Sequence, residues 1–246
     1  MLIVGSPVSP YVRKVLIVLH LKGLEYEIDP ITPFYGNDEF SRLSPLRRIP
    51  LLINGDLVVN DSTAIAEYLD ETFPNPGVMP DGPENRARAR WIEEYADSRL
   101  GDLCIWSYFF PKFVAPRVFQ REPDLALIAR TETEDLPAAL DWLEGQAPEA
   151  DFLFGAAVAT ADIAVACVLR NAAIAGWTPD AVRWPKAAAW IDRVQALPAF
   201  QRTLTMEPAI LATPLEQRNA ALAAAGVKVS ATSFAEQSPR DSIMLR

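Results

Sequence analysis

The spacing of apolar residues changes once along this chain and divides it into two parts. In residues 1–82, short apolar runs typical of strands alternate with longer runs at helical spacing. The clearest strand pair is 51–53 and 57–59, because Asn54-Gly55-Asp56 between them is typical of a hairpin turn. The other elements predicted in this part are strands at 1–4 and 26–29 and helices at 10–21 and 61–69.

Prolines and glycines crowd the stretch from Pro74 to Pro83, which predicts a linker. Beyond it, apolar residues recur only at helical spacing. Residues 161–177 are apolar on nearly every side, so we expect them to form a buried central helix. The pattern predicts a mixed α/β domain over residues 1–82 and an all-helical domain over residues 83–210.

Residues 211–246 form a third predicted segment. Thr213 and Glu216 have the spacing of a capping box, which predicts a helix over 214–225 that ends at Gly226. Leu215 and Leu222 are seven residues apart and would share one side of that helix. We expect this side to dock on the helical domain, with the following residues as a loose lid; the alternative is a disordered tail.

Composition narrows the classes of function. The chain has 246 residues, of which 50% are hydrophobic, so it can bury a sizeable core. A formal net charge of −9 argues against binding to nucleic acid or to anionic membrane surfaces. No apolar run is long enough to span a bilayer, and the first residues do not resemble a signal peptide. We therefore expect a cytoplasmic protein without a membrane or nucleic-acid partner.

Few residues are available for metal or triad chemistry. The single histidine, His20, lies in an apolar helical stretch, and we interpret it as a packing residue. Cys104 and Cys167 are far apart within apolar helical patterns and predict buried free thiols. The sequence thus disfavours a metal site and a Ser-His-Asp triad.

The strongest candidate for chemistry is the turn between the first strand and the first helix. Pro10 suits the first helical position, which makes Ser9 the N-cap. Backbone N–H groups and the helix dipole stabilise an anion at such a point, and a thiolate is one such anion. The alternative is that Ser9 only caps the helix.

Several motifs together resemble the cytosolic glutathione transferase superfamily. Ser9-Pro10-Tyr11-Val12 is similar to the Cys-Pro-Tyr-Cys motif of glutaredoxins, with serine in the first position. The resemblance implies a thioredoxin-like α/β N-terminal domain followed by an all-α helical domain. The other segments that carry it are Ser44 to Leu52, Asn60 to Leu69, Thr160 to Ile163, and Trp190 to Phe200. One departure is Ala159, where the family often has serine or threonine before the aspartate that matches Asp162.

The resemblance also implies a glutathione site. Ile49 would precede a cis proline, Pro50, and offer its backbone to the peptide; an ordinary trans proline is the alternative. Asp61 and Ser62 would bind the γ-glutamyl end, unless Asp61 is a simple helix cap. Arg48 would lie near the glycyl carboxylate or, alternatively, in solvent.

The implied reaction is activation of the glutathione thiol for attack on a small hydrophobic electrophile, with a role in detoxification. Ser9 would donate a hydrogen bond to the thiolate; Ser6 and Tyr11 are the competing donors. The electrophile would bind between the domains, unless its expected aromatic neighbours are simply core residues. These neighbours are Tyr11, Trp106, Tyr108, Phe109 and Phe110.

Two alternative functions remain open at this stage. One is a different glutathione-dependent reaction, such as isomerisation, reduction of conjugates or reduction of peroxides. The other is a non-catalytic glutathione-binding module. For each of them the resemblance implies a homodimer, with residues 57–59 near the contact.

Overall fold

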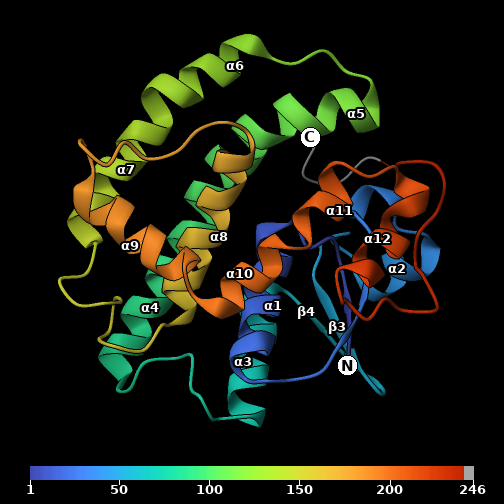
Figure 1. Ribbon diagram of the computed structural model, residues 1–246, viewed down its shortest axis with the longest axis horizontal. Coiled ribbons are helices and arrows are strands. Elements are labelled where there is room, and N and C mark those ends of the chain that lie inside the picture. The colour runs from blue at the N-terminus through green and yellow to red at the C-terminus, as the bar shows by residue number, and fades with distance from the viewer. Residues whose placement is uncertain (241–246) are drawn as a thin grey trace. The chain divides into compact units, whose positions relative to one another are not determined.

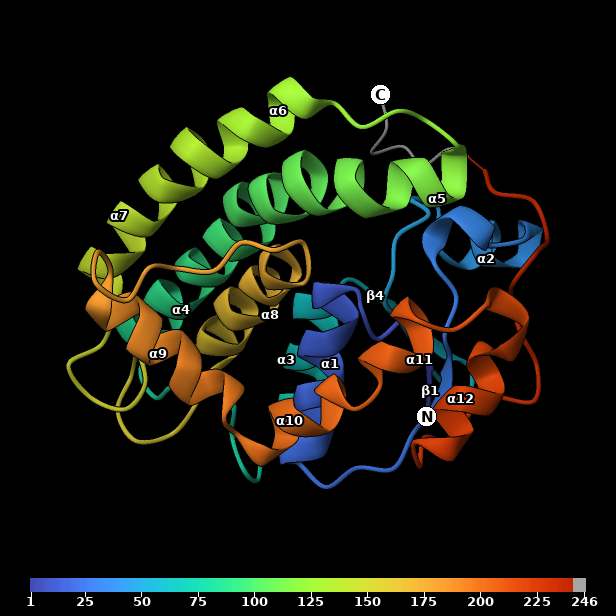
Figure 2. The ribbon, with the colours of Figure 1, turned by 45° about the horizontal axis from the view of Figure 1, so that its top comes forward.

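The fold comes from a computed structural model, which describes residues 1–240 (Figures 1 and 2). The described chain forms two compact units, one made of residues 1–76 and 198–240, the other of residues 77–197. The first unit is thioredoxin-like α/β and the second is all-helical, as expected. The units differ from the expected boundaries at 82 and 210, because residues 198–210 group with the α/β unit, where α10 (Pro198–Leu204) packs on α1 (Pro10–Leu21).

The α/β unit is built on a four-stranded sheet of order β2-β1-β3-β4. Strand β1 runs parallel to β2 and antiparallel to β3, and the predicted hairpin pairs β3 with β4. Its elements are β1 (Leu2–Val4), α1 (Pro10–Leu21), β2 (Glu27–Asp29), η1 (Pro33–Tyr35), α2 (Asp38–Leu43), β3 (Leu51–Asn54), β4 (Leu57–Asn60), α3 (Ser62–Thr72), α10 (Pro198–Leu204), α11 (Glu207–Leu211), η5 (Leu215–Gln217) and α12 (Arg218–Ala224).

Helices α1 and α3 lie side by side against the sheet (Figures 1 and 2). The apolar run Val15–Leu19 of α1 is fully buried, and so are Ile65 and Leu69 of α3. In the sheet, Ile3 pairs with Leu52 and both are buried. Burial of such side chains contributes about 1.5–3 kcal/mol each, which makes this layer the core of the unit.

The helical unit follows the strand-free pattern of its sequence. Residues 83–119 form one continuous helical stretch, whose hydrogen bonding is of the π type over Ala96–Leu100 and Asp102–Val114. The second of these stretches contains Pro111, a residue without an N–H group. No helix within residues 1–240 is long and apolar enough to cross a membrane. The elements of this unit are α4 (Pro83–Tyr95), η2 (Ala96–Leu100), η3 (Asp102–Val114), α5 (Ala115–Phe119), α6 (Leu125–Arg130), η4 (Thr131–Asp135), α7 (Leu136–Gln146), α8 (Thr160–Ile174) and α9 (Pro185–Gln195).

A buried carboxylate organises the start of the central helix α8. Asp162 is fully buried, and its Oδ2 accepts from the N–H of Ala159 at 2.9 Å. Its Oδ1 accepts from the N–H of Leu153 at 3.0 Å and from Nε1 of Trp190 at 2.7 Å. Burial raises the pKa of Asp162, and these three donors act in the opposite direction. Asp162 therefore joins the loop, α8 and α9, although Ala159 has no capping side chain.

The single histidine is a packing residue, as predicted. Nδ1 of His20 lies 3.1 Å from the carbonyl of Ala199, and Nε2 lies 2.9 Å from the hydroxyl of Tyr26. Since a carbonyl only accepts, Nδ1 carries the proton and the Tyr26 hydroxyl donates to Nε2. Burial lowers the pKa of His20 and so favours this neutral form. Cys104 and Cys167 are buried free thiols, which confirms their interpretation.

The expected capping box after residue 212 does not form. The Thr213 hydroxyl donates to the carbonyl of Pro208, and the chain makes a 3₁₀ turn before α12 begins. Leu222 is buried but Leu215 is 52% exposed, so the two leucines do not share one buried face. The chain after α12 bonds to the α/β unit along residues 28–38. The described part of this segment therefore packs with the α/β unit and not, as expected, as a lid on the helical domain. Residues 241–246 of the expected lid lie outside the described residues.

We predict that Asp162→Asn destabilises the helical unit. An amide at this place keeps one acceptor and turns an NH₂ group toward at least one of the three N–H donors. The loss should be about 2–4 kcal/mol, since a hydrogen bond to a charged group is lost and a buried donor is left unpaired.

Urea denaturation followed by far-ultraviolet circular dichroism measures this loss. Asp192→Asn, at an exposed position of α9, is the matched control and should change stability by less than about 0.5 kcal/mol. Equal midpoints for both variants would show that the Asp162 network does not stabilise the unit.

Candidate functional site

The register of the sheet brings three of the sequence motifs to one end of it. Val4, the last residue of β1, pairs with Leu51, and Leu51 pairs in turn with Asn60. The chain leaves β1 into the turn that carries Ser9, enters β3 from Ile49-Pro50, and leaves β4 into Asp61-Ser62. Segments that are about 40 and 50 residues apart in sequence are therefore neighbours across adjacent strands, which lie about 5 Å apart.

Close packing at Gly5 holds the first two segments together. A side-chain carbon at this position would lie 2.6 Å from Cγ2 of Val12 and 3.0 Å from Cβ of Ile49. The φ angle of Gly5 is 146°, in a region that favours glycine. Glycine therefore lets the turn that leads to Ser9 approach Ile49 directly.

Ser9 is the N-cap of α1 and Pro10 is its first residue, as predicted. The side chain of Ser9 makes no capping hydrogen bond, contrary to the alternative that Ser9 only caps the helix. The first bond of the helix runs from the N–H of Arg13 to the carbonyl of Ser9 at 2.9 Å. The half-buried hydroxyl of Ser9 thus lies at the positive end of a 12-residue helix, with no partner among residues 1–240.

The two competing donors lie in the same turn. Ser6 is 3% exposed, and its buried hydroxyl has no hydrogen-bond partner in the described part of the chain. Tyr11 is half-buried in the first turn of α1. Ser9 is therefore the more accessible of the two serines, and Ser6 the more enclosed.

Two buried cations of α1 fix this turn, and the sequence motifs did not identify them. Nζ of Lys14 donates to the hydroxyl of Thr63 at 3.1 Å and so connects α1 to the first turn of α3. Arg13 is fully buried and pairs with Glu207 of α11 at 2.9 Å. The signal available in the sequence was the placement of two charges in an otherwise apolar helix.

Asp61 caps α3 through its own side chain. Its Oδ1 accepts from the N–H groups of Thr63 and Ala64 at 2.9 and 3.1 Å. The φ angle of Asp61 is 77°, a region that non-glycine residues rarely occupy and that often marks functional sites. Ser62 follows with 3% exposure. The carboxylate of Asp61 thus binds two of the N–H groups that we expected to bind a ligand. Its other oxygen, Oδ2, has no hydrogen-bond partner within residues 1–240.

The peptide bond between Ile49 and Pro50 is cis, which confirms the prediction for this motif. Both side chains are buried, whereas Arg48 is exposed. Ser44 closes the loop before them, because its hydroxyl donates to the carbonyl of Arg48 at 2.9 Å and accepts from the N–H of Arg48 at 3.1 Å. Ser44, which directly follows α2, therefore fixes the backbone of this segment through two hydrogen bonds.

The aromatic residues that we expected near the electrophile differ in how deeply they are buried. Tyr108 is fully buried, and its hydroxyl accepts from Nζ of Lys112 at 2.9 Å; Phe109 is also buried. Trp106 and Phe110 are half-buried, with ring centroids 5.6 Å apart. In the helical unit, Tyr108 and Phe109 are core residues, and Trp106 and Phe110 are the partly exposed members of the set.

The helical unit also has an open surface hollow, which the expected aromatic residues do not line. The loop 148–156 and helix α9 line it, and it contains the ion pair Lys186–Glu149 at 2.6 Å. None of the residues predicted for glutathione or for the electrophile lines it. The hollow is therefore no part of the candidate site.

Comparison with known proteins identifies the family. Residues 3–77 match the family described as "Glutathione S-transferase, N-terminal domain", and residues 116–193 match "Glutathione S-transferase, C-terminal domain". The chain is 29% identical over 218 residues to Glutathione S-transferase 3 of Zea mays, which covers 83% of this chain and 93% of the relative. A solved structure of a glutathione S-transferase from Rhodospirillum rubrum F11 superposes with a TM-score of 0.76 at 25% identity, covering 88% of this chain and 97% of that one.

A more local similarity is to maleylacetoacetate isomerase of Rattus norvegicus, at 37% identity over 95 residues. It covers 37% of this chain and 44% of that enzyme, so less than half of the isomerase is matched. A thioredoxin-like unit with an all-helical partner unit defines the class of the fold. The chain belongs to the glutathione transferase superfamily.

Proposed function

We propose that this protein is a glutathione transferase in which Ser9 activates the glutathione thiol for attack on a small hydrophobic electrophile. The observation that carries the proposal is the sheet register, since Val4, Leu51 and Asn60 are paired neighbours. The segments that follow or precede them offer a free hydroxyl, a buried cis-proline turn and an acidic helix start.

Each part of glutathione has a matching partner in this arrangement. The ammonium group of the γ-glutamyl end binds Oδ2 of Asp61, and its carboxylate binds the hydroxyl and N–H of Ser62. The cysteinyl backbone pairs with the main chain of Ile49. The glycyl carboxylate binds Arg48, whose exposed guanidinium suits a bidentate contact.

Ser9 acts on the thiol of glutathione because its hydroxyl binds the thiolate more strongly than it binds the neutral thiol. A free thiol of this kind has a pKa of about 8.5, so little of it is thiolate at neutral pH. A hydroxyl that donates to the sulfur stabilises the thiolate and hence lowers that pKa, and the N-terminal end of α1 adds to the effect. The thiol proton passes to solvent water. The thiolate then forms a bond to the electrophilic carbon, while the leaving group departs from that carbon with the electron pair of the broken bond.

The electrophile contacts the half-buried rings of Trp106 and Phe110 in our proposal. Their tilted pair offers apolar surface of the kind that holds small hydrophobic compounds. Tyr108 and Phe109 are buried in the core and do not contact the electrophile in this proposal. Tyr11 remains a proposed contact from the α/β unit.

Isomerisation is a second candidate reaction, favoured by the local similarity to the maleylacetoacetate isomerase of Rattus norvegicus. The two reactions differ in the fate of glutathione. A transferase consumes one thiol for each product, whereas an isomerase returns it. Titration of free thiol during turnover distinguishes the two, because only transfer depletes it.

We predict that Ser62→Ala weakens glutathione binding about 10- to 150-fold. The reason is the loss of one hydrogen bond to a charged group, which contributes roughly 1.5–3 kcal/mol. Isothermal titration calorimetry of both proteins measures the dissociation constant of glutathione. Ser98→Ala, at an exposed position of η2, is the control and should bind as the wild type does. Equal affinity of Ser62→Ala and wild type would rule out this assignment.

We predict that Ser9→Ala raises the pKa of the bound thiol by about 1–2 pH units, because the thiolate loses a hydrogen-bond donor. Thiolate absorbance of the complex as a function of pH reports the shift. Turnover should fall while the dissociation constant for glutathione changes little. Ser6→Ala is the matched comparison, and if it produces this shift while Ser9→Ala does not, Ser6 is the donor.

We also infer that the protein is a homodimer that uses one edge of its sheet, which pairs with no further strand within residues 1–240. Strand β4 is that edge, and its first residue, Leu57, is 42% exposed beside the half-buried Val58 and Val59. Light scattering of the wild type should give the mass of two chains. Leu57→Glu should shift it toward one chain, whereas Leu125→Glu, 73% exposed on α6, should not. A wild-type mass of one chain contradicts the inference.

A further inference from the structure

Residues 227–240, which we call the strap, run along the edge of the sheet opposite β4. The N–H of Ile28 in β2 donates to the carbonyl of Lys228, and the N–H of Ser230 donates to the carbonyl of Ile28, both at 2.9 Å. Ile28 and Val229 thus form a parallel bridge. Figures 1 and 2 show the red end of the chain passing beside α2. The strap therefore covers an edge that would otherwise expose unpaired backbone groups.

A buried carboxylate of β2 depends on the strap for both of its oxygens. Asp29 is 1% exposed, and its Oδ1 accepts from the hydroxyl of Ser233 at 2.8 Å. Its Oδ2 accepts from the N–H of Phe234 at 2.7 Å. Burial raises the pKa of Asp29, and the two donors from the strap oppose that rise. The backbone carbonyl of Asp29 accepts from the N–H of Gly5 at 2.8 Å, at the turn that leads to Ser9.

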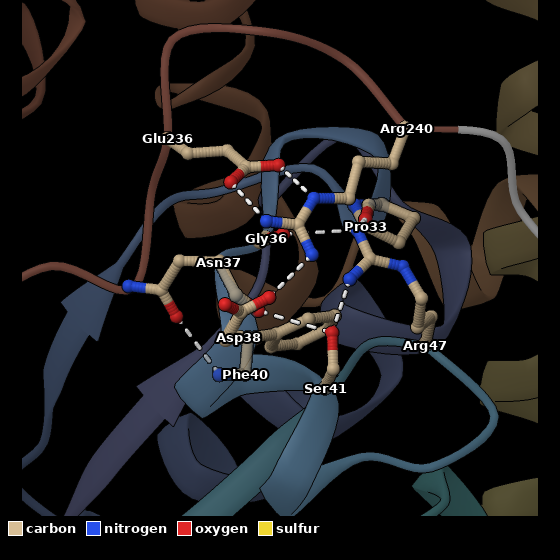
Figure 3. Close-up of polar contacts among 9 residues, drawn as sticks. All are labelled: Pro33, Gly36, Asn37, Asp38, Phe40, Ser41, Arg47, Glu236 and Arg240. Atoms are coloured by element: carbon tan, nitrogen blue, oxygen red, sulfur yellow. Dashed lines mark hydrogen bonds and ion pairs between the residues drawn. The ribbon is translucent and has the colours of Figure 1, made fainter.

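Farther along, the strap binds the segment that leads into α2. The N–H of Asn37 donates to the carbonyl of Phe234 at 2.8 Å, and the N–H groups of Glu236 and Arg240 donate to the carbonyls of Tyr35 and Phe34 at 2.7 Å. The guanidinium of Arg240 pairs with Asp38 at 2.6 Å and with Glu236 (Figure 3). Backbone bonds and ion pairs thus hold residues 34–38 to the strap.

Arg47 continues this connection toward the candidate glutathione site. Its Nη2 donates to the carbonyls of Pro33 and Gly36 at 3.1 and 2.9 Å, and Nη1 donates to the hydroxyl of Ser41 (Figure 3). Arg47 has a φ angle of 48° and directly precedes Arg48 and Ile49. A continuous series of contacts therefore leads from the strap through residues 33–41 and Arg47 to those two residues.

We propose that the strap is a positioning element of this protein, which holds residues 31–48 in place and thereby sets the affinity of Arg48 and Ile49 for the glycyl and cysteinyl parts of glutathione. The second half of this statement rests on the proposed function. Ser233 and Arg240 are positioning residues in this scheme, since they touch Asp29 and Asp38 and not the ligand.

The test uses the full chain with Ser233→Ala and Arg240→Ala combined. Ser238→Ala with Arg202→Ala is the matched control, because it removes one hydroxyl and one positive charge at exposed positions of the same unit. Hydrogen–deuterium exchange without glutathione is the first measurement. Amides of residues 31–48 should exchange about 5- to 30-fold faster in the strap variant only.

Kinetics with glutathione is the second measurement. The strap variant should show a raised KM for glutathione with kcat and the pKa of the bound thiol unchanged, since Ser9 is untouched. The single variant Arg240→Ala, which alters only an exposed side chain, should shift both measurements in the same direction if the double variant folds poorly.

The outcomes separate this proposal from the proposed function. An unchanged rate of amide exchange in residues 31–48 would overturn the strap as a positioning element, whatever the KM for glutathione. Faster exchange with an unchanged KM would overturn its effect on the site. If the wild type binds no glutathione, the proposed function fails, and exchange alone then decides whether the strap holds the segment.

Discussion

The pairing of Val4 with Leu51 and of Leu51 with Asn60 is the constraint on which the candidate site depends. A shift of one residue in either ladder would turn every side chain of the shifted strand to the opposite face of the sheet. It would also separate the Ser9 turn, the cis-proline turn and the start of α3. The buried side chains of β1 and β3 prevent such a shift, because it would expose them to water.

Buried charges then fix what the sheet brings together. Asp162 collects three N–H donors in the helical unit, and Asp29 takes two donors from the strap in the α/β unit. Lys14 and Arg13 connect α1 to α3 and α11. Removing one partner of such a group leaves an uncompensated polar atom in the interior, which costs more than the bond contributes on average. These few contacts therefore define one geometry for loops that have little apolar surface.

Prediction from sequence succeeded where a local pattern has a single structural solution. The hairpin at Asn54-Gly55, the proline at the start of α1, the buried helix α8 and the cis peptide before Pro50 are all present. It failed where one pattern has several solutions. The hydroxyl of Thr213 donates to the carbonyl of Pro208 and does not form the predicted capping box. The chain after α12 forms hydrogen bonds with the edge strand β2, where docking on the helical domain was predicted.

The amino-acid sequence by itself determined the order of elements, the division into an α/β part and a helical part, and the family. Those features follow from periodicity and from turn residues, which act over a few neighbours along the chain. Only the tertiary structure decided that Asp61 caps its own helix, that Tyr108 is a core residue, and that Asp29 meets Ser233 across 204 positions. The reason is physical, since burial and the pairing of distant polar groups depend on which surfaces meet after folding.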